Sequence, residues 1–325
     1  LQNTFAGRPA GAAMTADQPV SDRFQLLAGP WYHVSDLDGQ HLQALQLRWF
    51  DHWLKDDDTA TVTGQPVRFQ AIGSSKWFHT NAYPFPEATP TRLYLSLGGG
   101  LHAKPSTDES TATLQYLSRG PVSGRSLEQW SLGMGSFMAS QTGRSVRYDQ
   151  DNTRLQRDAL TYTSDAFDTE KLLAGPVGLT VFATADRADT LWVAHLDDLS
   201  PDGVSRPLTE GALLGSHRAL DPEASWVLPD GTVLRPQHPS TKSAAEPVVP
   251  GELTRYDVEI FPTAAILAPG HRLRLTLTTY DFPHLVPTRP QRAALAGGVY
   301  RISQGGIHAS HLVVPLADPA DMEQP

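Results

Sequence analysis

Short segments in which apolar and polar residues alternate fill the sequence from residue 91 onward. The clearest is HRLRLTLTTY, residues 271–280, where Leu273, Leu275 and Leu277 share one face and Arg or Thr residues fall between them. An apolar period of two is typical of a β-strand with one buried face. Further segments share this style, at residues 91–97, 175–184, 190–199, 254–262 and 310–316. The alternation predicts strands for most of the chain.

Turn-rich stretches separate these segments, and the longest is PDGTVLRPQHPSTKSAAEPVVPGE at 229–252. The 325 residues include 26 Gly and 26 Pro, which mark turns, so we expect many short elements. No second amphipathic helix of comparable length follows the one near the N-terminus. This combination is typical of an antiparallel β-sandwich of jelly-roll kind, galactose-binding-like in style. We predict such an all-β domain for residues 91–325.

The first 90 residues have a different pattern. RFQLLAGP at 23–30 predicts a buried strand that ends at Gly-Pro, and QPVRFQAIG at 65–73 predicts a second strand. Between them lies an amphipathic helical segment at 38–58. A strand, a helix and a strand in succession predict part of an α/β sheet. We therefore expect two domains, 1–90 and 91–325, with the Pro-broken segment 76–91 as a linker.

The helical segment carries its apolar residues at spacings of three and four. Leu42, Leu45, Trp49 and Trp53 fall on one helical face, and Phe50 widens it. Such a stripe predicts a helix that is packed against a core, so we expect Trp49 and Trp53 to be buried.

Composition limits the classes of partner. The formal net charge is -9, which argues against nucleic acid because phosphate binding needs a basic stripe. No apolar run approaches the ~20 residues of a membrane span, so no membrane partner is predicted. The chain has no Cys, which excludes disulfides, thiolate metal sites and a cysteine nucleophile. The chain begins at Leu1 without Met or a visible leader, and its localisation is unknown from the sequence.

LLAGPWYH at 26–33 resembles the segment that carries the catalytic histidine in the cocaine-esterase and X-Pro dipeptidyl-peptidase family of serine hydrolases. In that family a strand ends in Gly-Pro-Trp-x-His. Other segments resemble this family in the same order along the chain: VRFQAIGSSKW at 67–77, TRLYLS at 91–96, LDDLSPDG at 196–203, LAPGHRLRLTL at 267–277 and HASHLVVPL at 308–316.

This resemblance implies a fold and a site. The chain would form the C-terminal portion of an α/β-hydrolase domain, followed by the jelly roll. His33 would be the general base that accepts the proton of a serine nucleophile. Trp31 and Tyr32 would either pack against the end of the strand or contact the substrate. That substrate would be a small ester or a peptide, cleaved through an acyl-enzyme. The resemblance implies no cofactor and no metal, and leaves the choice between X-Pro peptides, aryl esters and other acylated molecules open.

The other two members of a catalytic triad are not found in the sequence. The Gly-x-Ser-x-Gly elbow lacks its closing Gly at each Gly-x-Ser triplet, which end at Ser75, Ser126, Ser145 and Ser205. Asp17 lies in a loop-like segment rather than after a strand. We therefore expect the nucleophile and the acid to precede Leu1, in an N-terminal hydrolase segment that is this chain's partner. The chain alone is predicted to be inactive.

A second class of function stays open, namely a carbohydrate-binding or interaction module without catalysis. Trp130, Trp192 and Trp226 would then be the aromatic platforms for a ligand. The first 90 residues argue against this alternative, because an independent binding module has no need of an incomplete hydrolase sheet.

Two groups of residues raise the question of a metal site. His308 and His311 are three residues apart, but positions i and i+3 of a strand point to opposite faces. Asp197, Asp198 and Asp202 do not have the spacing of a calcium loop, and Pro-Asp-Gly is a turn by itself. We therefore predict no metal site.

Overall fold

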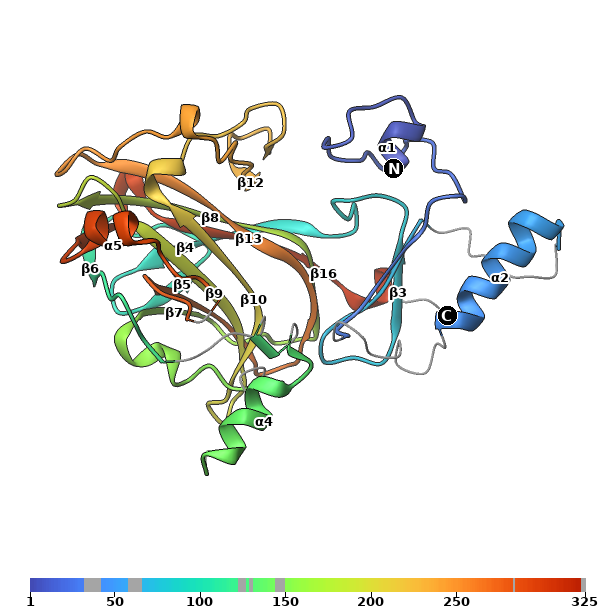
Figure 1. Cartoon of the computed structure of the whole chain (residues 1–325), viewed down its shortest axis with the longest axis horizontal. Helices are drawn as coiled ribbons and strands as arrows, with labels where there is room; N and C mark the ends of the chain where they lie inside the picture. Colours follow the sequence, from blue (N-terminus) through green and yellow to red (C-terminus); the bar gives the residue numbers. More distant parts are fainter. Residues whose placement is uncertain are drawn as a thin grey trace.

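A computed structural model describes residues 1–31, 42–57, 66–121, 127–128, 131–143, 150–282 and 284–322. Figure 1 shows a large curved array of strands with a smaller sheet beside it. The strands of the smaller sheet come from the N-terminal part of the chain. The predicted site residues Tyr32 and His33 lie outside the described residues, as does Trp130.

The smaller sheet has three strands in the order β1-β2-β3. β1 (Leu26–Ala28) runs parallel to β2 (Val67–Gln70), and helix α2 (Leu42–Lys55) belongs to the connection between them. This arrangement confirms the predicted strand, helix and strand. β3 (Trp77–Thr80) pairs antiparallel with β2. The prediction of a linker over 76–91 was therefore wrong, because the prolines that follow residue 80 hid a four-residue strand.

The large array contains eleven strands in the described ranges. They run in the order β10-β9-β14-β7-β5-β4-β16-β8-β15-β6, and β13 pairs with β8. Their bounds are β4 (Thr89–Ser96), β5 (Gly100–His102), β6 (Ser110–Gln115), β7 (Leu160–Ser164), β8 (Lys171–Ala185), β9 (Leu191–Leu199), β10 (Ser205–Leu214), β13 (Thr254–Leu267), β14 (Arg272–Thr278), β15 (Val299–Gln304) and β16 (His311–Ala317). All neighbours are antiparallel except β5 and β7. The β-rich C-terminal part is confirmed, while its jelly-roll connectivity stays a prediction.

The remaining helices and strands are short. They are α1 (Gln2–Phe5), α4 (Met134–Gln141), α5 (Arg289–Leu295), β11 (Trp226–Val227) and β12 (Val233–Arg235), and α5 begins with a capping box on Thr288. In the part of the chain that the structure describes, no helix has the length and apolar character needed to span a bilayer.

The array curves so far that β10 meets β13. The Thr209 hydroxyl donates to the Phe261 carbonyl oxygen at 2.7 Å, which links the two strands through side chain and backbone. Gly211 lies at the closest point, where a Cβ atom would overlap the Glu259 carbonyl oxygen. Only glycine therefore fits at this position of β10. Because the array curves in this way, it encloses an apolar core.

Trp192 lies at the centre of this core. Its ring is fully buried and contacts Tyr256 and Tyr300, each with ring centroids 5.1 Å away. Tilted aromatic pairs of this kind add stabilisation beyond the apolar area that they bury. Trp192 is therefore a core residue and not the exposed ligand platform that the binding-module alternative requires.

The smaller sheet packs on the array through a second apolar cluster. Phe69 and Phe78 are buried together with Leu172 and Met322. The backbone amide of Ile72 also donates to the Ala264 carbonyl oxygen of β13 at 2.8 Å. Strands β2 and β3 thus share a core with the array, and the domain boundary near residue 90 stays a prediction.

Helix α2 is poorly covered by the rest of the described chain. It contains no buried residue, and its Phe50 and Leu54 are 54% and 75% exposed. Figure 1 shows α2 on the side of the smaller sheet that faces away from the large array. The prediction that Trp49 and Trp53 are buried was wrong for the described residues, where both are only half-buried. The amphipathic pattern was correct, but no described element lies over it as a core would.

Candidate functional site

The predicted catalytic segment begins where β1 ends. Ala28 is the last residue of the strand, and Gly29, Pro30 and Trp31 follow it. In an open sheet of parallel strands, ligands bind beyond the carboxyl ends of the strands. His33 is two residues beyond Trp31 in the sequence, so the segment leaves the sheet at the edge where such a site would be.

Trp31 is held by two contacts. Its ring lies 6.0 Å from that of Trp77 at an angle of 46°, and it covers Gly29 so closely that a Cβ atom there would overlap the ring. The guanidinium of Arg68 lies over the ring of Trp77, 5.0 Å from its centroid, and burial lowers the pKa of Arg68. These contacts fix the chain as it leaves β1. The predicted contact of Trp31 with a substrate stays a prediction.

An apolar cavity of about 370 Å³ adjoins this strand end. It lies between the smaller sheet and the array, and its lining includes Gly29, Pro30, Phe69, Tyr83 and Ala264. Burial raises the pKa of the Tyr83 phenol. The cavity has the size and the apolar walls of a small-molecule pocket.

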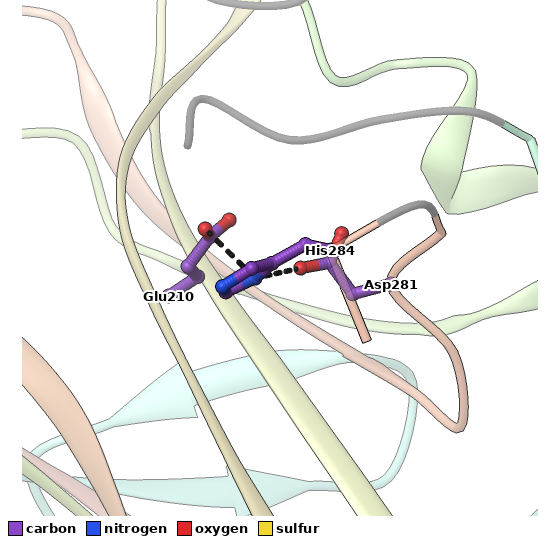
Figure 2. Close-up of side chains that lie close together, drawn as sticks. All are labelled: Glu210, Asp281 and His284. Atoms are coloured by element: carbon purple, nitrogen blue, oxygen red, sulfur yellow. Dashed lines mark hydrogen bonds and ion pairs between the residues drawn. The ribbon is translucent and has the colours of Figure 1, made fainter. Parts of the chain in front are cut away.

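A second group of functional side chains lies in the large array. Glu210 of β10, with Asp281 and His284 from the loop after β14, brings three metal-ligating side chains together. Figure 2 shows the His284 ring between the two carboxylates. Their ligand atoms all lie within 4.8 Å of one another. We call Glu210, Asp281 and His284 the acid–histidine cluster.

Strand register explains part of this arrangement. His195 of β9 stands directly opposite Glu210 of β10. The register shifts between Pro207 and Thr209, which makes Leu208 an extra residue in β10. Because side chains alternate across a strand, a shift of one residue decides which face Glu210 takes. The bulge therefore places Glu210 beside His195.

Distances within the group are short. His284 Nδ1 lies 2.8 Å from Asp281 Oδ2 and 3.7 Å from Glu210 Oε1. The other oxygen of Glu210, Oε2, lies 3.5 Å from His195 Nδ1. Both carboxyl side chains are nearly buried, at 11% exposure for Glu210 and 1% for Asp281. Glu210 thus bridges two imidazoles.

The charges of this group act on one another. Burial opposes the charged form of His195, but Glu210 and Asp281 outweigh that cost and raise its pKa. The hydrogen bond with Asp281 raises the pKa of His284 despite partial burial. The two carboxylates therefore favour the protonated, positively charged forms of His195 and His284.

The acid–histidine cluster was not predicted from the sequence. Asp281 and His284 are three residues apart and were available as a local signal, but Glu210 is about seventy positions away in the sequence. Its proximity depends on strand register and on the bulge at Leu208. Among the described residues, the group that could hold a metal does not include the aspartates at 197, 198 and 202.

Asp197 instead forms a buried polar network. Its carboxylate accepts hydrogen bonds from the Asn152 amide at 2.9 Å and from the Ser205 hydroxyl at 3.1 Å. Burial raises the pKa of Asp197 to about 6, although His195 and these donors act in the opposite direction. On the opposite face of β9, Asp198 pairs with His271 at 2.8 Å.

The network predicts a pH dependence of stability. The folded-state pKa of Asp197, about 6, lies above the ordinary value of 3.8 for an Asp carboxyl, so the folded state binds more protons than the unfolded state between these values. The free energy of unfolding should therefore fall as pH rises through this window. Between pH 4.5 and pH 7.5, of which about 1.5 pH units lie below the folded-state pKa, Asp197→Asn should reduce that fall by about 2 kcal/mol, at ~1.4 kcal/mol per unit.

Urea titrations at pH 4.5 and pH 7.5 check this prediction. The matched control is Asp168→Asn at an exposed position, which should leave the difference between the two pH values unchanged. An Asp197→Asn chain whose stability keeps the full pH dependence would show that another group causes it.

Residues 60–313 match the family described as the X-Pro dipeptidyl-peptidase C-terminal non-catalytic domain. The chain belongs to this family. The match covers most of the chain, including β2, β3 and the acid–histidine cluster, and it begins after the end of β1. The resemblance to the cocaine-esterase and X-Pro dipeptidyl-peptidase family of serine hydrolases is thereby confirmed.

The names of two relatives also support a hydrolase family. A putative serine esterase of Mycobacterium bovis is 29% identical over 336 residues, which cover 97% of this chain and 49% of that protein. Cocaine esterase of a Rhodococcus species is 24% identical over 324 residues, covering 90% of this chain and 51% of that protein. The chain therefore spans about half the length of the curated relatives it matches. Their names support a hydrolase family for the chain.

Solved structures share the fold. An aminopeptidase from a marine sediment Thaumarchaeota archaeon superposes with a TM-score of 0.67 at 18% identity, covering 91% of this chain and 49% of that one. An α-amino acid ester hydrolase gives 0.66 at 18% identity, with 90% and 50% covered. In both cases the shared fold is again about half of the longer protein.

Proposed function

We propose that this chain supplies the C-terminal half of a serine hydrolase that cleaves an ester or an amide, with His33 as the general base. The observation that carries the proposal is β1 itself. It is parallel to β2, it forms the end of the sheet among the described residues, and Gly-Pro-Trp-x-His follows it directly. A histidine after such a strand is the last triad member along an α/β-hydrolase chain.

The remaining catalytic groups belong to an N-terminal hydrolase segment that pairs with the outer edge of β1. Two features support this partner. Within the described ranges, β1 has a neighbouring strand on only one side. The apolar residues of α2, such as Phe50 and Leu54, are exposed beside it. A further set of strands and helices would cover both features, and the relatives are long enough to contain one.

The mechanism follows from these roles. The imidazole of His33 accepts the proton of the serine hydroxyl as the serine oxygen bonds to the substrate carbonyl carbon. The same proton then passes to the leaving alcohol or amine as the acyl-enzyme forms. Water, activated by His33, hydrolyses the acyl-enzyme and restores the serine. The acidic residue orients the imidazole and stabilises its charged form.

The substrate is a small ester or a peptide. The cavity beside β1 has apolar walls and favours an uncharged acyl or aryl group. Two relatives are named esterases, which favours the ester, while the family's name favours an X-Pro peptide. Trp31 and Tyr32 are the proposed contacts on the side of the strand end.

The carbohydrate-binding alternative has less support. Trp192 is buried in the core. Trp226 donates its indole N–H to the Gly11 carbonyl oxygen at 2.9 Å, and Arg235 lies 4.9 Å from its ring centroid. These contacts occupy the polar edge and one face of the ring that a sugar would need.

The test compares the chain alone with the chain joined to the segment encoded upstream of Leu1. We expect the 325-residue chain to lack turnover of p-nitrophenyl butyrate and labelling by a fluorophosphonate. The joined protein should show both, and its upstream segment should contain a Gly-x-Ser-x-Gly elbow and an acid after a strand. A start codon directly before Leu1, or enzymatic turnover by the chain alone, contradicts the proposal.

A further inference from the structure

We propose that Glu210, Asp281 and His284 form a binding site for a divalent transition-metal ion of the Zn²⁺ class. This site lies in the large array, and the proposal does not depend on the proposed hydrolase function. The family's name implies no metal at this place, and none was predicted from the sequence.

The spacing of the ligand atoms fits such an ion. An ion about 2.1 Å from each nitrogen or oxygen holds neighbouring ligand atoms roughly 3.0 to 3.4 Å apart, in octahedral or tetrahedral geometry. His284 Nδ1 is 2.8 Å from Asp281 Oδ2 and 3.7 Å from Glu210 Oε1, values on either side of that range. Small side-chain adjustments would therefore bring all three atoms to bonding distance of one ion; Figure 2 shows the His284 ring between the two carboxylates.

The donor set selects the class of ion. Two carboxylate oxygens and one imidazole nitrogen suit Zn²⁺ and its neighbours, whereas Ca²⁺ and Mg²⁺ prefer oxygen ligands alone. The two carboxylates also neutralise a divalent charge. Three protein ligands leave at least one position for water, and His284, at 36% exposure, lies on the side open to solvent.

His195 of β9 contacts the cluster through Glu210. It is 1% exposed, and its Nδ1 lies 3.5 Å from Glu210 Oε2, the oxygen that faces away from His284. Its Nε2 is buried and has no hydrogen-bond partner among the described residues. Outer-shell imidazole contacts of this kind orient ligating carboxylates. His195 is therefore a positioning residue for Glu210.

The backbone also fixes the position of Glu210. Gly211 lies against the Glu259 carbonyl oxygen where no Cβ atom fits, and the bulge at Leu208 sets the register with β9. Asp281 and His284 lie on the loop between β14 and α5, which is closed by the amide of Leu285 donating to the Asp281 carbonyl oxygen at 2.6 Å. A bound ion would thus fasten this loop to β10.

The competing interpretation is an ion-pair cluster held by protons. With both imidazoles charged, the two carboxylates are balanced without any metal. The two interpretations differ in stoichiometric metal binding and in what the ion does to stability, because a ligand that binds only the folded state raises its melting temperature.

The experiment uses the full chain, freed of metal by EDTA and then dialysed against ZnCl₂. We expect one Zn²⁺ per chain and a rise in melting temperature on adding Zn²⁺. Glu210→Gln and Asp281→Asn should each weaken Zn²⁺ binding at least tenfold and abolish the rise. His284→Gln should do the same, and because His284 is partly exposed this variant preserves the buried carboxylates. Co²⁺ in place of Zn²⁺ should give visible absorption that these variants lose.

The matched control is His271→Asn, which breaks the pair with Asp198 on the same array but leaves the cluster intact. It should bind Zn²⁺ as the unmodified chain does. Circular dichroism shows whether each variant folds. The proposal is overturned if the unmodified chain binds no stoichiometric Zn²⁺, or if folded His284→Gln and Glu210→Gln chains bind it with unchanged affinity.

Discussion

Replacing His33 by alanine in the joined, active protein is expected to lower kcat for ester hydrolysis by about 10²–10⁴-fold. The imidazole accepts the serine proton and returns it to the leaving group, and an alanine side chain has no group that can do this. KM should change little, because His33 acts on the reacting proton rather than on substrate binding. Stopped-flow or steady-state assays with p-nitrophenyl esters measure both constants.

The control for this variant is His102→Ala at an exposed position of β5, which should leave kcat unchanged. The melting temperature of the His33→Ala protein should stay near that of the unmodified protein, which separates loss of chemistry from loss of fold. Unchanged kcat in a folded His33→Ala protein would show that another residue is the general base.

The sequence predicted the elements whose apolar pattern is local. The alternation in 271–280 gave β14, and the spacing of Trp49 and Trp53 gave α2. Strands without such a pattern were missed. β3 is four residues long and precedes a Pro-rich segment, and β10 contains both a proline and a bulge that disturb its alternation.

Burial was harder to predict than secondary structure. The stripe on α2 predicted a core position, yet none of its residues is buried in the described chain. Amphipathicity shows that a face is suited to packing but not which element covers it. Trp192 is the opposite case, since it is buried although it was considered as an exposed platform. An isolated Trp in a strand does not indicate whether its face of the strand is buried. Only the three-dimensional neighbours Tyr256 and Tyr300 decide this.

The two candidate sites illustrate the same limit. Gly-Pro-Trp-x-His is a contiguous motif, so the sequence alone identifies where the proposed base lies. The acid–histidine cluster joins residues from β10 and the loop after β14, and its assembly depends on register. A motif search finds the first kind of site and misses the second.

Trp192→Ala is expected to lower the free energy of unfolding by about 3 to 5 kcal/mol, the range for removing a large aromatic side chain from a packed core. The indole is fully buried between Tyr256 and Tyr300, so its removal leaves a cavity that β-strand backbones cannot collapse to fill. A loss of this size is a large fraction of the stability of a typical domain.

Trp192→Phe separates the causes of that loss. The indole Nε1 has no hydrogen-bond partner among the described residues, so the stabilisation by Trp192 comes from apolar and aromatic packing. Phenylalanine keeps one ring in contact with both tyrosines and removes a buried polar group, so its cost should be less than half that of alanine. Urea titrations of both variants measure this order. If alanine cost less than 1 kcal/mol, Trp192 would not be the centre of the core, and its role as an exposed aromatic platform would be open again.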